Sequence, residues 1–202
     1  RDPEMSRGLG DVYKRQKWYR PDLQGIVIVG DIDVDAVEAK LKAIFADVQK
    51  AVNPAERVYY PVADNKEPIV AIGTDKEVDD PSIEVYFKQD ATPDSEKNNV
   101  GYLASQYMTS MITSMLNARL SELTQSANPP FTRAYSSYGN FFVAKTKEAL
   151  NLSASSKADG IEKALKVLLQ EAERARRFGF TESEYARARA NYLQRLESAY
   201  NE

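Results

Sequence analysis

The chain has 202 residues, of which 43% are hydrophobic and 28% are charged, and its net charge is −3. This composition suits one large domain or one and a half smaller ones with a packed core, and it argues against wholesale disorder. The slightly negative charge argues against a nucleic-acid partner held by a strong positive field. The best apolar run, residues 25–30, is far shorter than the roughly 20 residues that span a bilayer, so no membrane span is expected.

The sequence contains neither histidine nor cysteine. The usual general base, the Ser-His-Asp triad, the thiol nucleophile and the commonest zinc ligands are therefore missing. We expect no catalytic residue, no metal site and no cofactor in this chain. A site built from carboxylates alone would suit calcium or magnesium better than zinc.

Residues 1–16 differ from the rest of the chain, because they show no helical or alternating period. The stretch "GLGDVYKRQ" resembles translated adapter read-through, so we interpret residues 1–16 as a non-native leader. Residues 17–48 follow with a predicted strand at 25–31 and a helix from Asp33, its cap, to about residue 48.

Gly30 joins this strand to the helix, in the layout of a nucleotide-binding turn. A dinucleotide fingerprint needs three glycines, G-x-G-x-x-G, whereas this turn has one. Asp31, Asp33 and Asp35 would also repel a phosphate. The pattern favours a corner with a helix cap, and a small nucleotide-binding module is the weaker alternative.

Residues 49–66 contain two prolines and no clear period, which is typical of a linker. The remaining residues, 67–202, form the second domain. Apolar alternation and turn residues predict four strands there, at 67–75, 82–90, 132–138 and 141–156, with a turn at Gly139-Asn140 in the last pair.

Three helices are predicted in the same domain. The first covers about 95–125, the second begins at a capping box of Asp159 and Glu162 and ends at Gly179, and the third begins at a capping box of Thr181 and Glu184. The order is then β-β-α-β-β-α-α after the β-α tail of a preceding domain. The predicted class is α+β, a layered antiparallel sheet with helices on one face.

Three stretches carry a family resemblance: "WYRPDLQGIVIVGDIDVDAVEAKLKAIF", "LNARLSELTQSANPPFTRAYSSYGNF" and "GIEKALKVLLQEAERARRFGFTESEYARARANYLQRLESA". In this order and spacing they resemble the end of one domain and the whole of the next in the insulinase/pitrilysin family of zinc peptidases. The resemblance covers about residues 17–202. The "QSANPPF" insertion is similar to the periplasmic-type bacterial branch, which favours a bacterial periplasm or cell envelope.

Members of this family hydrolyse peptides with a zinc ion held by an inverted H-x-x-E-H motif and a distant glutamate. Those ligands belong to the first domain, and this chain has no histidine to match them. The resemblance thus implies the tail of a catalytic domain, residues 17–48, followed by a second peptidase-like domain that forms the other wall of a substrate chamber. Its expected partners are the upstream catalytic domain and a peptide substrate, with zinc in the parent enzyme only.

Some family members hold the substrate with an arginine and a tyrosine of the second domain. Tyr135, in "TRAYSSY", stands where that tyrosine would fall, and Arg119 is near the arginine but out of register. We therefore predict both as substrate-binding residues. The alternatives are a half-buried strand aromatic for Tyr135 and a solvated helix residue for Arg119.

Two functions from different classes follow. The chain is expected to be the inactive, peptide-binding half of a zinc metalloendopeptidase, or a structural or assembly subunit of the same fold without proteolysis. An intact upstream H-x-x-E-H motif would favour the first. Residues 25–48 are expected to be mobile or to associate with other chains in isolation, because one strand and one helix cannot bury their apolar faces alone.

Overall fold

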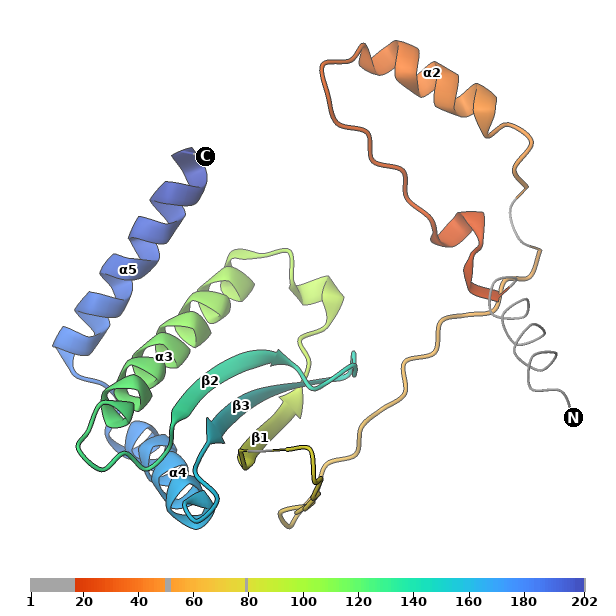
Figure 1. Cartoon of the computed structure of the whole chain (residues 1–202). Helices are drawn as coiled ribbons and strands as arrows, with labels where there is room; N and C mark the ends of the chain where they lie inside the picture. The colour runs from red at the N-terminus through yellow and green to blue at the C-terminus, as the bar shows by residue number, and fades with distance from the viewer. Residues whose placement is uncertain (1–16, 50–51, 79, 202) are drawn as a thin grey trace, which may run out of the picture. The chain divides into compact units, whose positions relative to one another are not determined.

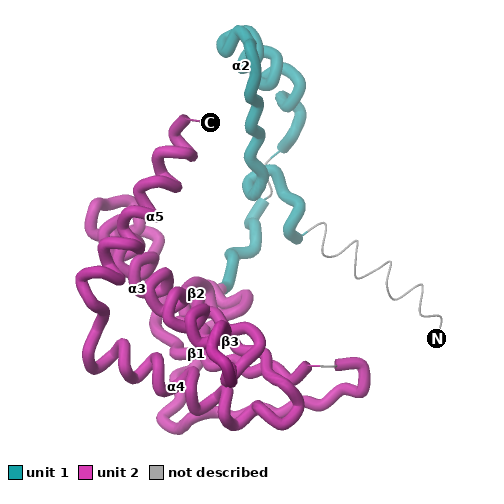
Figure 2. Tube along the Cα trace, turned by 60° about the vertical axis from the view of Figure 1, so that its left-hand side comes forward, with its two compact units in different colours: residues 1–58 teal, residues 59–202 magenta. Residues whose placement is uncertain are grey.

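The computed structural model describes residues 17–49, 52–78 and 80–201. Figure 1 shows the succession of helices and strands. The chain divides into two compact units, Arg1–Val58 and Tyr59–Glu202 (Figure 2), and the division falls inside the expected linker 49–66. The predicted leader, residues 1–16, lies outside the described residues.

The first unit contains the short 3-10 helix η1 (Pro21–Leu23) and the helix α2 (Val34–Ile44). The predicted cap is confirmed, since Oδ1 of Asp33 accepts a 3.0 Å hydrogen bond from the amide of Ala36. Gly30 lies in a bend just before this cap. A carboxylate therefore already occupies the N-terminus of α2, where a phosphate would have to bind, and the corner is the better interpretation of Gly30.

The predicted strand at 25–31 is wrong, because this segment pairs with no described residue. Its apolar side chains are exposed, with Val27 at 86% and Val29 at 91%. A strand is stabilised by a hydrogen-bonded neighbour and by burial of one face, and the described part of the first unit offers neither. No residue of α2 is buried either.

The second unit is built on a three-stranded antiparallel sheet of β1 (Ser82–Asp90), β2 (Arg133–Asn140) and β3 (Lys147–Ser155). The strand order is β1-β3-β2, so β3 lies in the centre and is the most buried strand. The ladder aligns Val85 of β1 and Ser136 of β2 with Leu152 of β3.

Helices cover one face of this sheet (Figure 1): α3 (Val100–Thr124) packs on β2, and α4 (Ile161–Phe178) packs on β3 and β1. The helix α5 (Glu182–Asn201) packs on α3. The core between the helices and the sheet consists of Leu116, Leu120, Phe131, Leu152, Ala154, Ala164 and Leu168. Met111 and Met115 of α3 pack with Ala188 of α5, so these two methionines are core residues.

Two strand predictions are corrected by the structure. Residues 67–75 belong to no strand, and Ile69, Val70 and Ile72 are at least 77% exposed. The predicted order β-β-α-β-β-α-α therefore becomes β-α-β-β-α-α. Apolar alternation raises the propensity of a segment to form a strand, but the strand forms only where a second strand pairs with it. The turn predicted at Gly139-Asn140 lies instead at 141–146, since β2 extends to Asn140 and Gly139 pairs with Ala149.

The helix ends follow capping chemistry. Asn99 caps α3 by accepting a 2.9 Å hydrogen bond from the amide of Tyr102, so α3 begins after a separate 3-10 turn, η2 (Asp94–Glu96). The capping box predicted from Asp159 and Glu162 is wrong, because α4 begins after Gly160 without a side-chain cap. No helix of the described ranges has the length and apolarity to cross a membrane.

The turn between α4 and α5 is as predicted. Gly179 ends α4 with φ of 64°, a conformation that favours glycine. Thr181 and Glu184 form the reciprocal box: the amide of Thr181 donates to Oε2 of Glu184 at 2.7 Å, and the amide of Glu184 donates to Oγ1 of Thr181 at 3.3 Å.

Candidate functional site

The sheet has one face toward the helices and one face away from them. Ser136 faces α3, because its Oγ donates to the carbonyl of Thr113 at 3.3 Å and its amide donates to Asn117. Side chains alternate along a strand, so Tyr135 points to the other side. We call this other side the open face, and its central side chains are Glu84, Tyr86, Lys88, Tyr135, Ser137, Asn151 and Ser153.

The register sets these side chains in two rows. Glu84, Ser153 and Tyr135 lie opposite one another across the three strands, and Tyr86, Asn151 and Ser137 form the next row. The rows carry hydroxyl, amide and carboxylate groups. A polar sheet face of this kind can hydrogen-bond a polypeptide backbone.

Tyr135 is 44% exposed and close to Tyr86, which donates a hydrogen bond to Oε2 of Glu84. This hydrogen bond, followed by burial and by the charge of Glu84, raises the pKa of Tyr86 to about 12. Tyr86 is therefore a neutral hydrogen-bond donor at physiological pH. Nδ2 of Asn151, in the same row, is buried and makes no hydrogen bond within the described part of the chain.

An aromatic group adjoins the polar rows. The ring of Tyr86 packs edge-on against Phe141, with 5.5 Å between the ring centroids, and packs at a tilt of 41° against Phe142, with 5.0 Å between the centroids. Phe141 and Phe142 belong to the β2–β3 connection, and Phe142 has φ of 51°, which is uncommon for a bulky residue. Phe142 is 66% exposed, so the connection presents an apolar surface beside the open face.

The outer edge of β1 completes the arrangement. Only β3 pairs with β1 among the described residues, so the backbone amides and carbonyls along the other edge of β1 can accept a further strand. An extended peptide that pairs with this edge would lie beside the open face. The site therefore suits binding of a polypeptide.

Arg119 lies elsewhere, on the helix side of the sheet. Its Nε and Nη2 bind Oε1 and Oε2 of Glu184 at 2.5 and 2.9 Å, and Nη2 also donates to the carbonyl of Gly179 at 3.0 Å. The guanidinium stacks on Phe180 at 4.5 Å. The solvated-helix alternative is wrong because Arg119 is only 8% exposed. The structure does not bring Arg119 and Tyr135 together. The guanidinium instead donates its hydrogen bonds to Gly179 and Glu184 at the α4–α5 turn.

Sequence reasoning missed the neighbours of Tyr135. The alternation of β1 separates Ile83 and Val85 from Glu84 and Tyr86, but it does not reveal which strand lies beside β1. The register with β3 places Tyr86 on the same face as Tyr135, in the adjacent row. The ring contacts of Tyr86 with Phe141 and Phe142 could not be predicted from the sequence either. They involve a connection in which Phe142 has a positive φ, and the sequence pattern gives no sign of this conformation.

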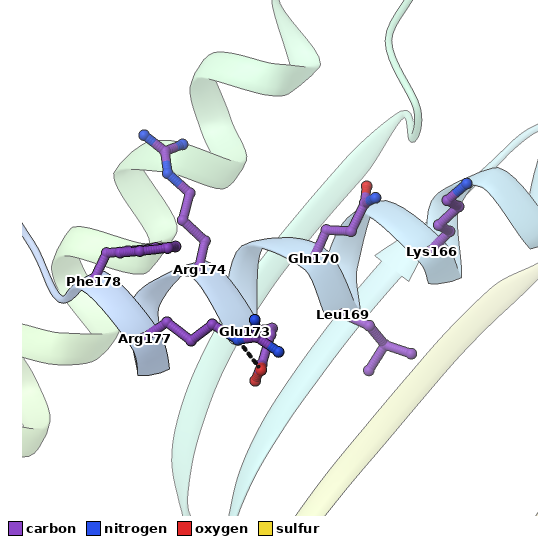
Figure 3. A pocket seen from close by; sticks show the side chains of 7 residues that line it. All are labelled: Lys166, Leu169, Gln170, Glu173, Arg174, Arg177 and Phe178. Carbon is purple, nitrogen blue, oxygen red and sulfur yellow. Dashed lines mark hydrogen bonds and ion pairs between the residues drawn. The ribbon is translucent and has the colours of Figure 1, made fainter.

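A shallow hollow of about 570 Å³ lies on the outer side of α4 (Figure 3). It is lined by Lys166, Leu169, Gln170, Glu173, Arg174, Arg177 and Phe178. Arg177 is held by Glu173 at 2.5 Å and Arg174 by Glu171 at 3.4 Å. The two arginines are thus paired with carboxylates of their own helix, which is typical of a charged, solvent-facing helix surface.

The family resemblance implies zinc, and the residues of this chain do not fit it. The sequence has no histidine and no cysteine, and the described residues contain no group of three acidic side chains that could hold a metal ion. Protein zinc sites are built on histidine nitrogen or cysteine sulfur, alone or together with carboxylate oxygen, and this chain has neither histidine nor cysteine.

A protein-family model matches most of the chain. The model described as "Peptidase M16 inactive domain" matches residues 15–192. No curated protein matches the sequence.

Solved structures share the fold. The first half of the periplasmic protease PqqL from Escherichia coli is similar over 96% of this chain and 40% of its own, with a TM-score of 0.73 and 22% identity. The complete PqqL is similar over 96% of this chain and 21% of its own, with the same TM-score and identity. An insulinase family protease of Yersinia pestis, itself described as predicted, is similar over 100% of this chain and 42% of its own, with a TM-score of 0.72 and 14% identity.

These likenesses confirm the layered α+β class. The chain spans less than half the length of each of these proteins.

Proposed function

Because the chain belongs to the peptidase M16 family and matches its inactive domain, we propose that it is the non-catalytic, peptide-binding part of a zinc metalloendopeptidase. The predicted resemblance to the insulinase/pitrilysin family is thereby confirmed. In this proposal the zinc ligands and the H-x-x-E-H motif lie on an upstream catalytic domain. Residues 67–202 form the opposite wall of the substrate chamber.

The observation that carries the proposal is the unpaired edge of β1 beside the open face. Strand addition uses main-chain hydrogen bonds for affinity and side-chain contacts for selectivity. We propose that Tyr135 contacts the bound peptide, since the residue is 44% exposed and lies in the row of Glu84 and Ser153. The substrate contact predicted for Arg119 stays a prediction. Its burial favours a structural role instead.

The test is binding of a fluorescent, unfolded peptide to the purified chain, followed by anisotropy. Strand addition predicts that a peptide N-methylated at alternate residues binds far more weakly than the unmodified one, because it lacks the required amides. Tyr135→Ala should weaken binding roughly fivefold or more. Tyr200→Ala is the control, since Tyr200 is 90% exposed on α5. Equal affinity for both peptides would contradict strand addition.

A second prediction of the proposal is that the chain does not hydrolyse the peptide. We expect no cleavage when zinc is added to the chain alone, and the peptide should stay intact by mass spectrometry. Cleavage that depends on added zinc would show that the chain has its own catalytic centre.

The location proposed for the parent protein is a bacterial periplasm or cell envelope, by analogy with PqqL, which is described as periplasmic.

The second candidate is a structural or assembly subunit of the same fold. The exposed apolar residues of 26–29 favour it, since such surfaces mark interfaces. The upstream gene sequence discriminates between the two, because a degraded H-x-x-E-H motif would support assembly and an intact motif would support proteolysis.

A further inference from the structure

We propose that Lys147 is the centre of a polar latch that fastens residues 60–64 to the sheet of the second unit. The linker contributes Tyr60, Ala63 and Asp64, the sheet contributes Lys88, Asp90 and Lys147, and the connection before β3 contributes Thr146. The latch lies wholly within the second unit. It makes Tyr60 the point at which the linker becomes part of the folded domain.

The ammonium of Lys147 is shared by two carboxylates. Its Nζ lies 2.6 Å from Oδ1 of Asp64 and 2.7 Å from Oδ1 of Asp90. The side chain of Lys147 is only 6% exposed, whereas those of Asp64 and Asp90 are 76% and 88% exposed. A buried ammonium must be paired. Asp90 does this from within the sheet, opposite Lys147 in the ladder, and Asp64 does it from the linker.

Two further hydrogen bonds hold the linker backbone. Nζ of Lys88 donates to the carbonyl of Ala63 at 2.9 Å, and Oγ1 of Thr146 donates to the carbonyl of Tyr60 at 3.3 Å. Lys88 also lies 5.6 Å from the ring centroid of Phe141. The donors come from β1, from β3 and from the connection before β3, so the latch spans the end of the sheet where these elements meet.

The latch can open without damage to the sheet. When the ion pair between Asp64 and Lys147 breaks, the ion pair between Lys147 and Asp90 remains. The strand pairing of Asp90 with Lys147 does not involve the linker. Opening therefore costs one ion pair with a solvent-exposed carboxylate and two hydrogen bonds. Salt screens such a pair. The linker is thus held by a reversible contact.

The absence of cysteine from the chain permits a direct test. A nitroxide on Ala63→Cys in the full chain reports the mobility of the linker, because the side chain of Ala63 is exposed and only its carbonyl joins the latch. We expect a restrained spectrum in this background. Asp64→Asn and Lys147→Gln should each raise the ratio of mobile to restrained label roughly two- to fivefold, as expected for one ion pair.

Three controls make the result specific. Lys145→Gln removes a neighbouring lysine that takes no part in the latch and should leave the spectrum unchanged. Asp64→Glu should retain the restrained component, and 1 M salt should act like Asp64→Asn. Because Asp64 lies on the linker, Asp64→Asn keeps the test valid if Lys147→Gln fails to fold. A mobile label in the parent background, or no response to Asp64→Asn, would overturn the latch.

Discussion

The guanidinium of Arg119 and the carboxylate of Glu184 form a two-point ion pair that joins α3 to the first turn of α5. Glu184 has two tasks there, because the same carboxylate also accepts the amide of Thr181 at 2.7 Å. The pair thus couples a helix cap to a contact between helices. It explains why Arg119, a residue type that is seldom buried, lies beneath the α4–α5 turn.

Removal of Arg119 should destabilise the second unit strongly. Arg119→Ala leaves the carboxylate of Glu184, which is only 14% exposed, without its cation and removes the hydrogen bond to Gly179, so we expect a loss of about 3 kcal/mol in the free energy of unfolding. Urea unfolding followed by circular dichroism measures it. Arg174→Ala, at a side chain that is 59% exposed, should cost less than about 0.5 kcal/mol. Similar losses for the two variants would contradict the structural role.

Stability should fall in acid because of Glu184. The hydrogen bonds from Arg119, which outweigh burial, lower the pKa of Glu184 to about 2 from 4.5. A carboxyl whose pKa is lower in the folded state stabilises the protein above its unfolded pKa, and that contribution is lost as pH falls from about 4.5 toward 2. Unfolding free energies between pH 6 and pH 2.5 should therefore decline less steeply in Glu184→Gln than in the parent chain.

Glu173 provides the control for this pH dependence. Arg176 and Arg177 also lower the pKa of Glu173 to about 2. Its side chain is 41% exposed, so solvent screening reduces the weight of its ion pairs. Glu173→Gln should change the pH dependence less than Glu184→Gln does, and the reverse order would contradict the importance of burial.

The contrast between residues 82–90 and 67–75 shows what local pattern can predict. Residues 82–90 alternate between apolar and polar side chains, and residues 67–75 are rich in apolar side chains, so both were predicted as strands. Only residues 82–90 pair with another strand, β3. The same holds for 25–31, which pairs with no described residue. Two helix starts were predicted correctly, because Asp33 and the box of Thr181 and Glu184 act within three residues of themselves. The start of α3 at Asn99 and the start of α4 at Gly160 were not predicted.

The candidate site was less predictable than the fold for a physical reason. Tyr135 could be found because it lies in a segment that resembles a family motif. Glu84 and Tyr86 are about 50 residues away in sequence, and only the register of the sheet places them on the same face as Tyr135, in its row and in the next row. The position of Arg119 could not be derived from its own helix, since its partners Gly179 and Glu184 belong to the α4–α5 turn.

Gly179 should be intolerant of any side chain. Its φ of 64° and ψ of −145° belong to a region that is almost restricted to glycine. Gly179→Ala should cost about 1–3 kcal/mol of unfolding free energy although the added methyl group meets no atom within 4 Å. Gly139→Ala is the matched control, because that position is equally open and lies in β2 without a positive φ. Equal thermal stability of the two variants would refute backbone strain as the cause.

Residues 25–48 should be the least protected part of the described chain. Val27, Val29 and the whole of α2 lack buried partners, whereas α3 is held by the core through Leu116 and Leu120. Amide hydrogen exchange should thus be much faster at 26–29 and in α2 than at 100–124, since local opening there exposes little additional apolar surface. Exposed apolar residues also favour self-association, so sedimentation should show larger species as concentration rises. Val27→Lys together with Val29→Glu should suppress these species. Slower exchange at 25–48 than in α3, in a monomeric sample, would mean that this segment is stable by itself.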